Sequence, residues 1–344
     1  MPASSVDVVR PAFDHMVQQL FRPFRLGQWI RLAFTGLLAG ELGTSGGCSF
    51  QLPWRPSNRP DRFLAQGVAP MNLLWVVGIA ALVVLSLVLL VALVYVSSRM
   101  RFVLFDSVIA RECHIARFWR SRSGPAFRYF VFQLFLLAAV VGGIAFFASI
   151  AAIIAFGTGW FRNPRQYILP VILIAAVFLV FLAAFLIIAF AISVLTKDFV
   201  VPQMAVEEVT VTEGWNRLWS MLLAEKAGYA GYIGLKIVLT IAGVVAVGIA
   251  AFVLVLALLI PVGLVGVVAV VSARAVGIGW NVLTISVAIL VGCIVVAALI
   301  FGVLLISVPS IVFFPAYSIY FLAARYPALN TVLYPPASPD GVSL

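Results

Sequence analysis

Apolar positions in this chain come in long unbroken runs, without the regular alternation of polar and apolar residues that is typical of a surface strand. Five such runs contain no charged side chain: 63–98, 129–161, 166–196, 237–273 and 275–324. Each run is longer than the roughly 20 residues that cross the hydrocarbon core of a bilayer as a helix. The pattern predicts an all-α fold, a polytopic helical membrane bundle that forms a single membrane domain over residues 1–344.

The ends of the spans follow from the polar and helix-breaking residues that flank these runs. A shorter apolar segment, 26–42, follows an amphipathic, interfacial segment at 1–25 and is predicted as a short additional span. With it, the chain has about six transmembrane helices. The five longer spans are predicted at 71–96, 126–156, 168–195, 233–260 and 281–308.

The last uncharged run is too long to be one span, because a helix over 275–324 would extend about 75 Å. Pro309 and Pro315 lie near its end, and proline removes a backbone donor and kinks or ends a helix. We therefore expect the span to stop at residue 308, a separate interfacial helix at 310–324 and a tail at 325–344.

Basic residues are distributed unevenly over the connections, and this predicts the orientation. The stretch 97–128 holds seven arginines against two carboxylates, and the net charge of the chain is +10. With the loops 97–125 and 196–232 and both termini inside, fifteen Lys and Arg lie inside and six outside, in agreement with the positive-inside rule. If the segment 26–42 only dips into the membrane, the counts become eleven and ten. The topology with fifteen basic residues inside and six outside fits the rule better. It predicts a prokaryotic cytoplasmic (inner) membrane protein with an external loop at 43–70.

Three segments that follow descending spans resemble one another. After the first two, a polar helix with tryptophan comes next and the chain then re-enters the membrane, and the amphipathic N-terminal segment has the same character. This favours a three-fold hairpin repeat, circularly permuted so that the third copy is divided between the two chain ends. The alternative is that aromatic and basic residues gather at every membrane interface. The three segments are Phe102–Asp106, Phe199–Gln203 and Ile311–Pro315.

Residues that could carry out chemistry are scarce. Lys236 lies about one turn inside its span, Glu41 is predicted at the outer end of the short span, and no Asp, Glu or His lies at mid-bilayer, which disfavours ion-coupled transport. Two histidines and three cysteines without a Cys-x-x-Cys pair predict no metal site. Ser45 would need a base within reach to act as a nucleophile, and both histidines are expected on the opposite side. We expect no cofactor and no enzymatic activity.

The cytoplasmic loops are therefore the candidate working surfaces. The basic loop could pair with the acidic loop 197–226 or contact anionic lipid headgroups, each arginine contributing about 1 kcal/mol near an anionic leaflet. Most basic residues flank apolar spans, so we expect no nucleic-acid partner. The candidate contact residues are Arg99, Arg101, Arg111, Arg117, Arg120, Arg122 and Arg128, and the candidate interfacial anchors are Trp119, Trp215 and Trp219.

Several of these segments carry a family resemblance. Arg101–Val108, Val201–Met204, Glu213–Trp219 and the opening stretch Phe21–Leu32 are similar to an uncharacterised prokaryotic multi-pass membrane family. That family resembles the membrane domain found beside glycerophosphodiester phosphodiesterases. The resemblance implies a membrane domain of unknown biochemical role, and because the spans leave no room for the catalytic domain, we expect no phosphodiesterase activity.

Two functional hypotheses follow. The first is a non-enzymatic integral membrane scaffold or accessory subunit that binds lipids, a membrane protein complex or further copies of itself. The second is a channel or facilitator for a small or lipidic solute at the centre of the three-fold repeat, which requires a continuous cavity through the bundle.

Overall fold

A computed structural model of the chain describes residues 4–41, 73–157, 168–277, 279 and 281–334. Of these described residues 90% are helical, and none lies in a strand. Five helices in the described ranges are long and apolar enough to cross a membrane. The predicted all-α, multi-pass fold class is confirmed.

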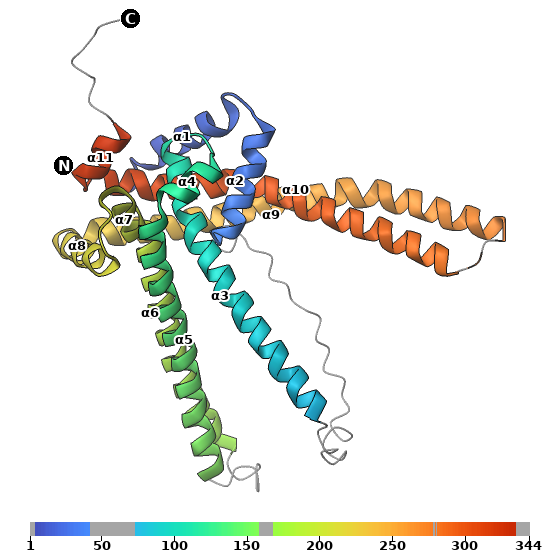
Figure 1. Cartoon of the computed structure of the whole chain (residues 1–344), viewed down its shortest axis with the longest axis horizontal. Coiled ribbons are helices and arrows are strands. Elements are labelled where there is room, and N and C mark those ends of the chain that lie inside the picture. Colours follow the sequence, from blue (N-terminus) through green and yellow to red (C-terminus); the bar gives the residue numbers. More distant parts are fainter. Residues whose placement is uncertain (1–3, 42–72, 158–167, 278, 280, 335–344) are drawn as a thin grey trace, which may run out of the picture.

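The long helices form arms that leave one end of the molecule in different directions (Figure 1). The helix α3 (Leu73–Ile109) is the first arm. The helices α5 (Ser123–Gly157) and α6 (Ile168–Leu195) pair as a second arm, and α9 (Lys226–Ala275) and α10 (Val282–Ala323) pair as a third. The third arm points away from the other two.

The short helices all gather where the arms meet, and we call this region the hinge end (Figure 1). Both described ends of the chain lie there, since the first and last helices belong to this group. The short helices are α1 (Val9–Phe21), α2 (Leu26–Leu38), α4 (Ile115–Ser121), α7 (Val201–Glu207), α8 (Val211–Ala224) and α11 (Pro327–Leu333).

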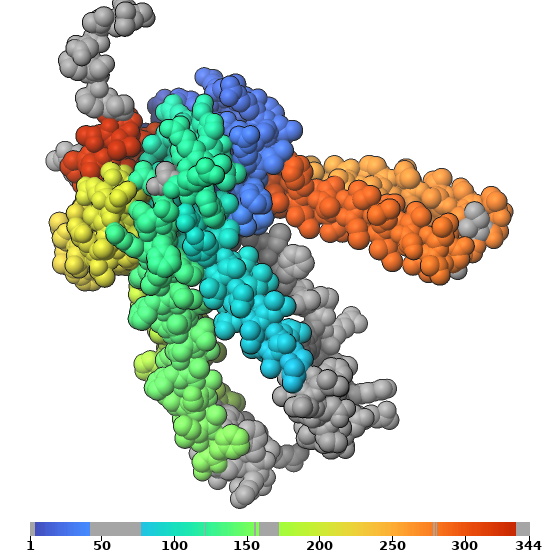
Figure 2. Space-filling model, in the orientation of Figure 1, coloured from blue at the N-terminus to red at the C-terminus, as the bar shows by residue number. Residues whose placement is uncertain are grey.

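The buried core of the molecule lies at the hinge end, and we call it the hinge core. All three segments that the sequence marks as repeats are part of it, so residues more than 200 positions apart pack together. In the space-filling view the hinge end is a filled mass, and the arms extend from it separately (Figure 2). The hinge core includes Phe102, Val103, Leu104, Phe199, Val200, Val201, Ile311, Val312 and Phe321.

The arms are covered very little by the rest of the chain. In α10 the buried residues begin only at Ser307, although the helix starts at Val282. A helix that is apolar on all sides and uncovered needs an apolar solvent, and a lipid bilayer provides one. The arms are therefore the parts of the protein that meet lipid.

The packing of the hinge core agrees with the predicted repeat. Phe102 meets Tyr129 of the ascending α5 edge-on, with ring centroids 6.0 Å apart, and Phe199 meets Tyr229 of the ascending α9 in the same way at 5.4 Å. The hinge end of α10 packs instead against α1 and α2 at the other end of the chain. That pairing is what a circular permutation of the third copy requires.

Two predicted elements differ from the structure, both because tertiary packing changes the outcome. The helix α10 continues through Pro309 and Pro315, so no separate interfacial helix forms at 310–324; instead this part of α10 is buried in the hinge core. Proline costs a helix interior about 3 kcal/mol, a cost that the burial of a whole helix turn can offset.

The segment 26–42, predicted as a short span, forms α2 over only 13 residues. At 1.5 Å per residue this is about 20 Å, which is less than the roughly 30 Å of a hydrocarbon core. The helix α2 packs against α3, and its Gln28 donates a hydrogen bond to the carbonyl of Arg111, just after the hinge end of α3. The predicted external loop 43–70 and the end of the tail, 335–344, lie outside the described residues.

Candidate functional site

A cleft of about 520 Å³ opens between α6 and α9, directly against the hinge core. Its walls are apolar. They come from one face of α6, including Ile187 and Phe190, and from one face of α9, including Ile237 and Ile241. Each of these four side chains is also exposed on the surface of its arm, so the cleft is open sideways, toward the space that lipid occupies. Its volume is in the range of ordinary small-molecule sites.

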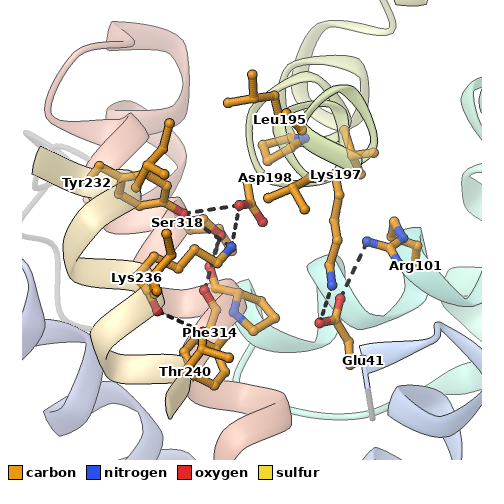
Figure 3. A pocket seen from close by; sticks show the side chains of 18 of the residues that line it. Glu41, Arg101, Leu195, Lys197, Asp198, Tyr232, Lys236, Thr240, Phe314 and Ser318 are labelled. Carbon is orange, nitrogen blue, oxygen red and sulfur yellow. Dashed lines mark hydrogen bonds and ion pairs between the residues drawn. The ribbon is translucent and has the colours of Figure 1, made fainter. Parts of the chain in front are cut away.

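The floor of the cleft is charged, in contrast to its walls. Five charged side chains from four parts of the chain converge there (Figure 3). Glu41 follows α2, Arg101 lies on α3, and Lys236 lies on α9. The other two are neighbours in the π-helical turn Thr196–Val200, which joins α6 to α7. The five residues, here called the charge cluster, are Glu41, Arg101, Lys197, Asp198 and Lys236.

Glu41 is the centre of the first half of the cluster. Lys197 Nζ lies 2.5 Å and Arg101 Nη1 3.4 Å from its two carboxylate oxygens, and Glu41 is only 4% exposed. Burial alone would raise the pKa of this carboxyl, but the adjacent Lys197 and Arg101 cations outweigh burial, and the pKa is lowered. Glu41 therefore remains an anion at neutral pH.

Asp198 is the centre of the second half. Lys236 Nζ donates a hydrogen bond to Asp198 Oδ2, and the Tyr232 hydroxyl donates to the same oxygen at 3.3 Å. Asp198 is buried, and its lysine partner is mostly covered. Buried carboxylates are stable when they are paired in this way. This pair joins the α5–α6 arm to the α9–α10 arm.

The π-helical turn explains how two neighbouring residues reach separate partners. One π-turn inserts an extra residue into a helix, and such insertions are frequent at functional sites. Here Lys197 points to Glu41 and Asp198 points to Lys236 (Figure 3). One turn of backbone therefore places a positively charged and a negatively charged side chain in the cleft.

Arg101 is the cation of the cluster with unused capacity. Its Nη2 donates a hydrogen bond to the carbonyl of Ala39 at 2.6 Å. Its Nε and Nη1 are buried and make no hydrogen bond within the described residues. Nη1 has the Glu41 carboxylate 3.4 Å away as an ion-pair partner, whereas Nε has neither an ion-pair partner nor a hydrogen bond within the described residues. Buried polar atoms are almost always satisfied, so Arg101 can still accommodate an additional acceptor.

The seven arginines predicted to contact lipid or a partner take several different positions. Besides Arg101, Arg99 donates to the Trp119 carbonyl and to the Tyr95 hydroxyl. Arg122 pairs with Asp106 at 3.3 Å and also donates to the carbonyl of Ala205.

Arg111 and Arg128 are exposed but also make internal hydrogen bonds, with Gln18 and with the carbonyl of Glu208. Arg117 and Arg120 are exposed, and neither forms an ion pair within the described residues. The basic and acidic loops do meet, but there the arginines bind backbone carbonyls of α7 and the turn after it.

The three predicted tryptophan anchors lie on the short helices of the hinge end. Trp119 on α4 stacks under the Arg99 guanidinium at 5.2 Å. Trp215 on α8 donates a hydrogen bond to the Thr196 hydroxyl at 3.1 Å. Trp219 is exposed. Two of the three therefore fasten hinge segments, and one faces outward.

Sequence reasoning did not find the charge cluster. The sequence pattern places Asp198 in the acidic loop, Lys236 about one turn inside its span and Glu41 at the outer end of the short span. The structure instead brings Glu41 to the hinge end, against Arg101 and Lys197. One signal was available, because charged residues next to long apolar runs are rare and tend to pair with one another.

No group of three His, Cys, Asp or Glu side chains that could hold a metal ion occurs in the part of the chain that the structure describes. The fold and the cleft define a helical multi-pass membrane protein with a charged site at one end of its spans. The chain belongs to a family of unknown function, DUF7544, whose profile matches residues 3–332. No curated protein and no solved structure matches it.

Proposed function

We propose that this protein is a non-enzymatic membrane accessory protein that binds a lipid in the cleft between α6 and α9. The observation that carries the proposal is the division of one cleft into apolar walls open toward lipid and a buried, charged floor. An amphiphile has the matching division, with a tail that prefers the walls and a polar head that can pair with the floor.

The energetics favour such a ligand. Exposed side chains such as Ile187, Phe190 and Ile237 offer no barrier to an acyl chain, because they already face an apolar solvent. Charges near the membrane are costly unless they are paired or solvated by polar groups. A lipid headgroup over the charge cluster provides such groups.

The channel or facilitator is the second candidate, and the hinge core counts against it. Packed aromatic rings of α9 and α10 fill the hinge core next to the cleft. Tyr232 and Tyr317 stack at 5.0 Å, and Phe321 lies 4.5 Å from Tyr232. A cleft that ends at such a packed core is better suited to binding a molecule than to conducting a solute across the membrane.

The orientation that we propose has the hinge end on the cytoplasmic side of a prokaryotic inner membrane. Both described ends of the chain lie at the hinge end, together with the exposed Arg117 and Arg120. Anionic lipid headgroups at that surface would attract these arginines. In a variant whose three native cysteines are replaced by serine, a membrane-impermeant thiol reagent on intact cells should fail to label Arg120→Cys, and efficient labelling would contradict this orientation.

The lipid proposal is tested by native mass spectrometry of the protein extracted in mild detergent. The wild type should carry about one lipid per chain. Ile237→Trp puts an indole into the cleft and should remove most of that lipid, while the charge cluster stays intact. Ile260→Trp is the matched control, because Ile260 is similarly exposed on α9 but does not line the cleft.

Equal lipid occupancy in the wild type and in Ile237→Trp would contradict a lipid site in the cleft, and so would a wild type without lipid. A loss of lipid in both tryptophan variants would indicate general lipid contact along α9 instead of this site.

A further inference from the structure

We infer that the lipid in the cleft carries a single net negative charge, through a phosphodiester headgroup whose phosphate accepts hydrogen bonds from Arg101. This inference rests on the proposed function and concerns only which headgroup the site selects.

The first step is the charge balance of the cluster. Three cations and two anions converge on the cleft floor, which leaves one positive charge. Lys197 pairs with Glu41 at 2.5 Å, and Lys236 pairs with Asp198. The excess charge is that of Arg101, which lies farther from Glu41, at 3.4 Å. Because an uncompensated buried charge is unfavourable, the floor favours one additional negative charge.

The second step is the hydrogen-bonding capacity of Arg101. The residue is 8% exposed and lines the cleft, and two of its three guanidinium nitrogens make no hydrogen bond within the described residues. A guanidinium is a planar set of donors that suits a phosphate group. Phosphate oxygens would therefore supply both the missing charge and the missing acceptors.

The third step separates a lipid phosphate from a free one. The cleft floor is continuous with apolar walls from Ile187 and Phe190 on α6 to Ile237 and Ile241 on α9. A free phosphate ion would leave these walls without a ligand. A phosphodiester lipid occupies both parts, and when the rest of its headgroup is uncharged its net charge is the single negative one required.

The experiment measures lipid exchange by native mass spectrometry in detergent micelles doped with defined lipids. Phosphatidylglycerol and phosphatidylcholine of identical acyl chains differ in net charge, and inorganic phosphate serves as the probe without a tail. The wild type should prefer phosphatidylglycerol by about tenfold, because both phosphates can accept hydrogen bonds from Arg101 but the choline cation of phosphatidylcholine cancels the net negative charge that the cleft floor favours. Inorganic phosphate at millimolar concentration should neither bind nor displace the lipid.

Two pairs of variants test the role of charge. Arg101→Gln should abolish the preference, while Arg120→Gln, at an exposed arginine on α4, should keep it. Thr240 also lines the cleft, one helical turn beyond Lys236. Thr240→Glu adds a negative charge without touching the buried pairs and should likewise abolish the preference, whereas Thr240→Gln should keep it. This second pair decides the question if Arg101→Gln does not fold.

Outcomes of the two proposals can be told apart. If the wild type holds both lipids equally and Ile237→Trp removes both, the cleft binds lipid but the charge inference is overturned. Displacement of the lipid by inorganic phosphate also overturns it. If no lipid is held at all, the proposed function itself fails.

Discussion

The hinge core and the arms are built from the same helices but are stabilised in opposite ways. The helix α10 shows both in one element: its residues from Ser307 onward are largely buried by α1 and α2, whereas the part before them, from Val282, is exposed. At the hinge end, protein packs against protein, and specific side-chain contacts decide stability. In the arms, lipid replaces protein as the neighbour, and any apolar side chain serves equally well.

This difference explains where a site can form. Polar groups need neighbours in fixed positions, and in the described part of the chain the packed hinge end provides them. The charge cluster therefore lies where the packed core ends and the open walls of α6 and α9 begin. A ligand at that boundary contacts both regions.

The strongest test of the comparison is a pair of substitutions on α10. Phe321 is fully buried, while Phe301, on the same helix, is 46% exposed. Phe321→Ala should lower the free energy of unfolding by about 3–5 kcal/mol, because it leaves a cavity among aromatic rings. Phe301→Ala should change it by less than about 0.5 kcal/mol. Thermal unfolding in mild detergent measures both, and equal losses would mean that the arms pack as firmly as the hinge core.

A second test compares two ion pairs. Asp198→Asn removes the buried partner of Lys236 and should cost about 3 kcal/mol, because an unpaired cation remains near the core. Glu213 pairs with Arg217 on the outer surface of α8. Glu213→Gln should cost under about 1 kcal/mol, as exposed ion pairs do. If chemical denaturation gave the surface pair the larger effect, the charge cluster would not be a structural joint between the arms.

A third, smaller effect concerns the contact of α2 with α10. A Cβ atom added at Gly36 would lie 2.5 Å from Ile311 Cγ2, whereas one added at Gly234 meets nothing within 4 Å. Gly36→Leu should therefore cost about 2 kcal/mol by overpacking the hinge core. Gly234→Leu should be neutral or slightly stabilising, because leucine favours a helix over glycine. Comparable melting temperatures of the two variants would show that α2 can move freely away from α10.

The smallest effect is a pH dependence from His15, which fastens α1 to the hinge core. Its Nε2 donates to the Val108 carbonyl at 2.8 Å, and its Nδ1 therefore accepts from the Tyr320 hydroxyl at 3.1 Å. Burial, together with the Arg111 charge, lowers the pKa of His15 below its ordinary value of 6.5, although the hydrogen bond to the Val108 carbonyl acts in the opposite direction.

The unfolded chain then takes up a proton more readily than the folded one, so stability is full above pH 6.5 and falls as the pH drops below it. Melting temperatures should be measured between pH 7.5 and 5.5, a range around the ordinary histidine pKa of ~6.5, and should show this fall in the wild type. His15→Gln should flatten the slope, while the exposed His114→Gln should not. A slope unchanged in His15→Gln would assign the pH dependence to other groups.

The arms could be predicted from the sequence, and much of the hinge core could not. Long uncharged runs identify membrane helices because the bilayer imposes their length. The three hinge segments were found by their mutual resemblance, and the structure brings them into one core. The break at Pro309 and Pro315 was wrong, because the local cost of proline says nothing about the packing that α1 and α2 supply.

Which charged residues pair in the charge cluster could not be predicted from the sequence, for a related reason. Glu41, Arg101 and Lys236 are far apart in the chain, and no spacing rule relates them. The sequence also presents seven arginines of one loop as equivalent, whereas the fold turns Arg101 into the cleft and leaves Arg120 on the surface. Only the tertiary arrangement separates the two roles.

The central claim, a lipid held between α6 and α9 with its head on the charge cluster, is tested most directly by photo-crosslinking. A phosphatidylglycerol with a photoreactive group on its acyl chain is bound to the protein in micelles, and the modified peptides are mapped. Adducts should concentrate on residues 187–194 of α6 and 233–241 of α9, and should be lost in Ile237→Trp. Adducts spread evenly over all five long helices, and unchanged in that variant, would contradict the claim.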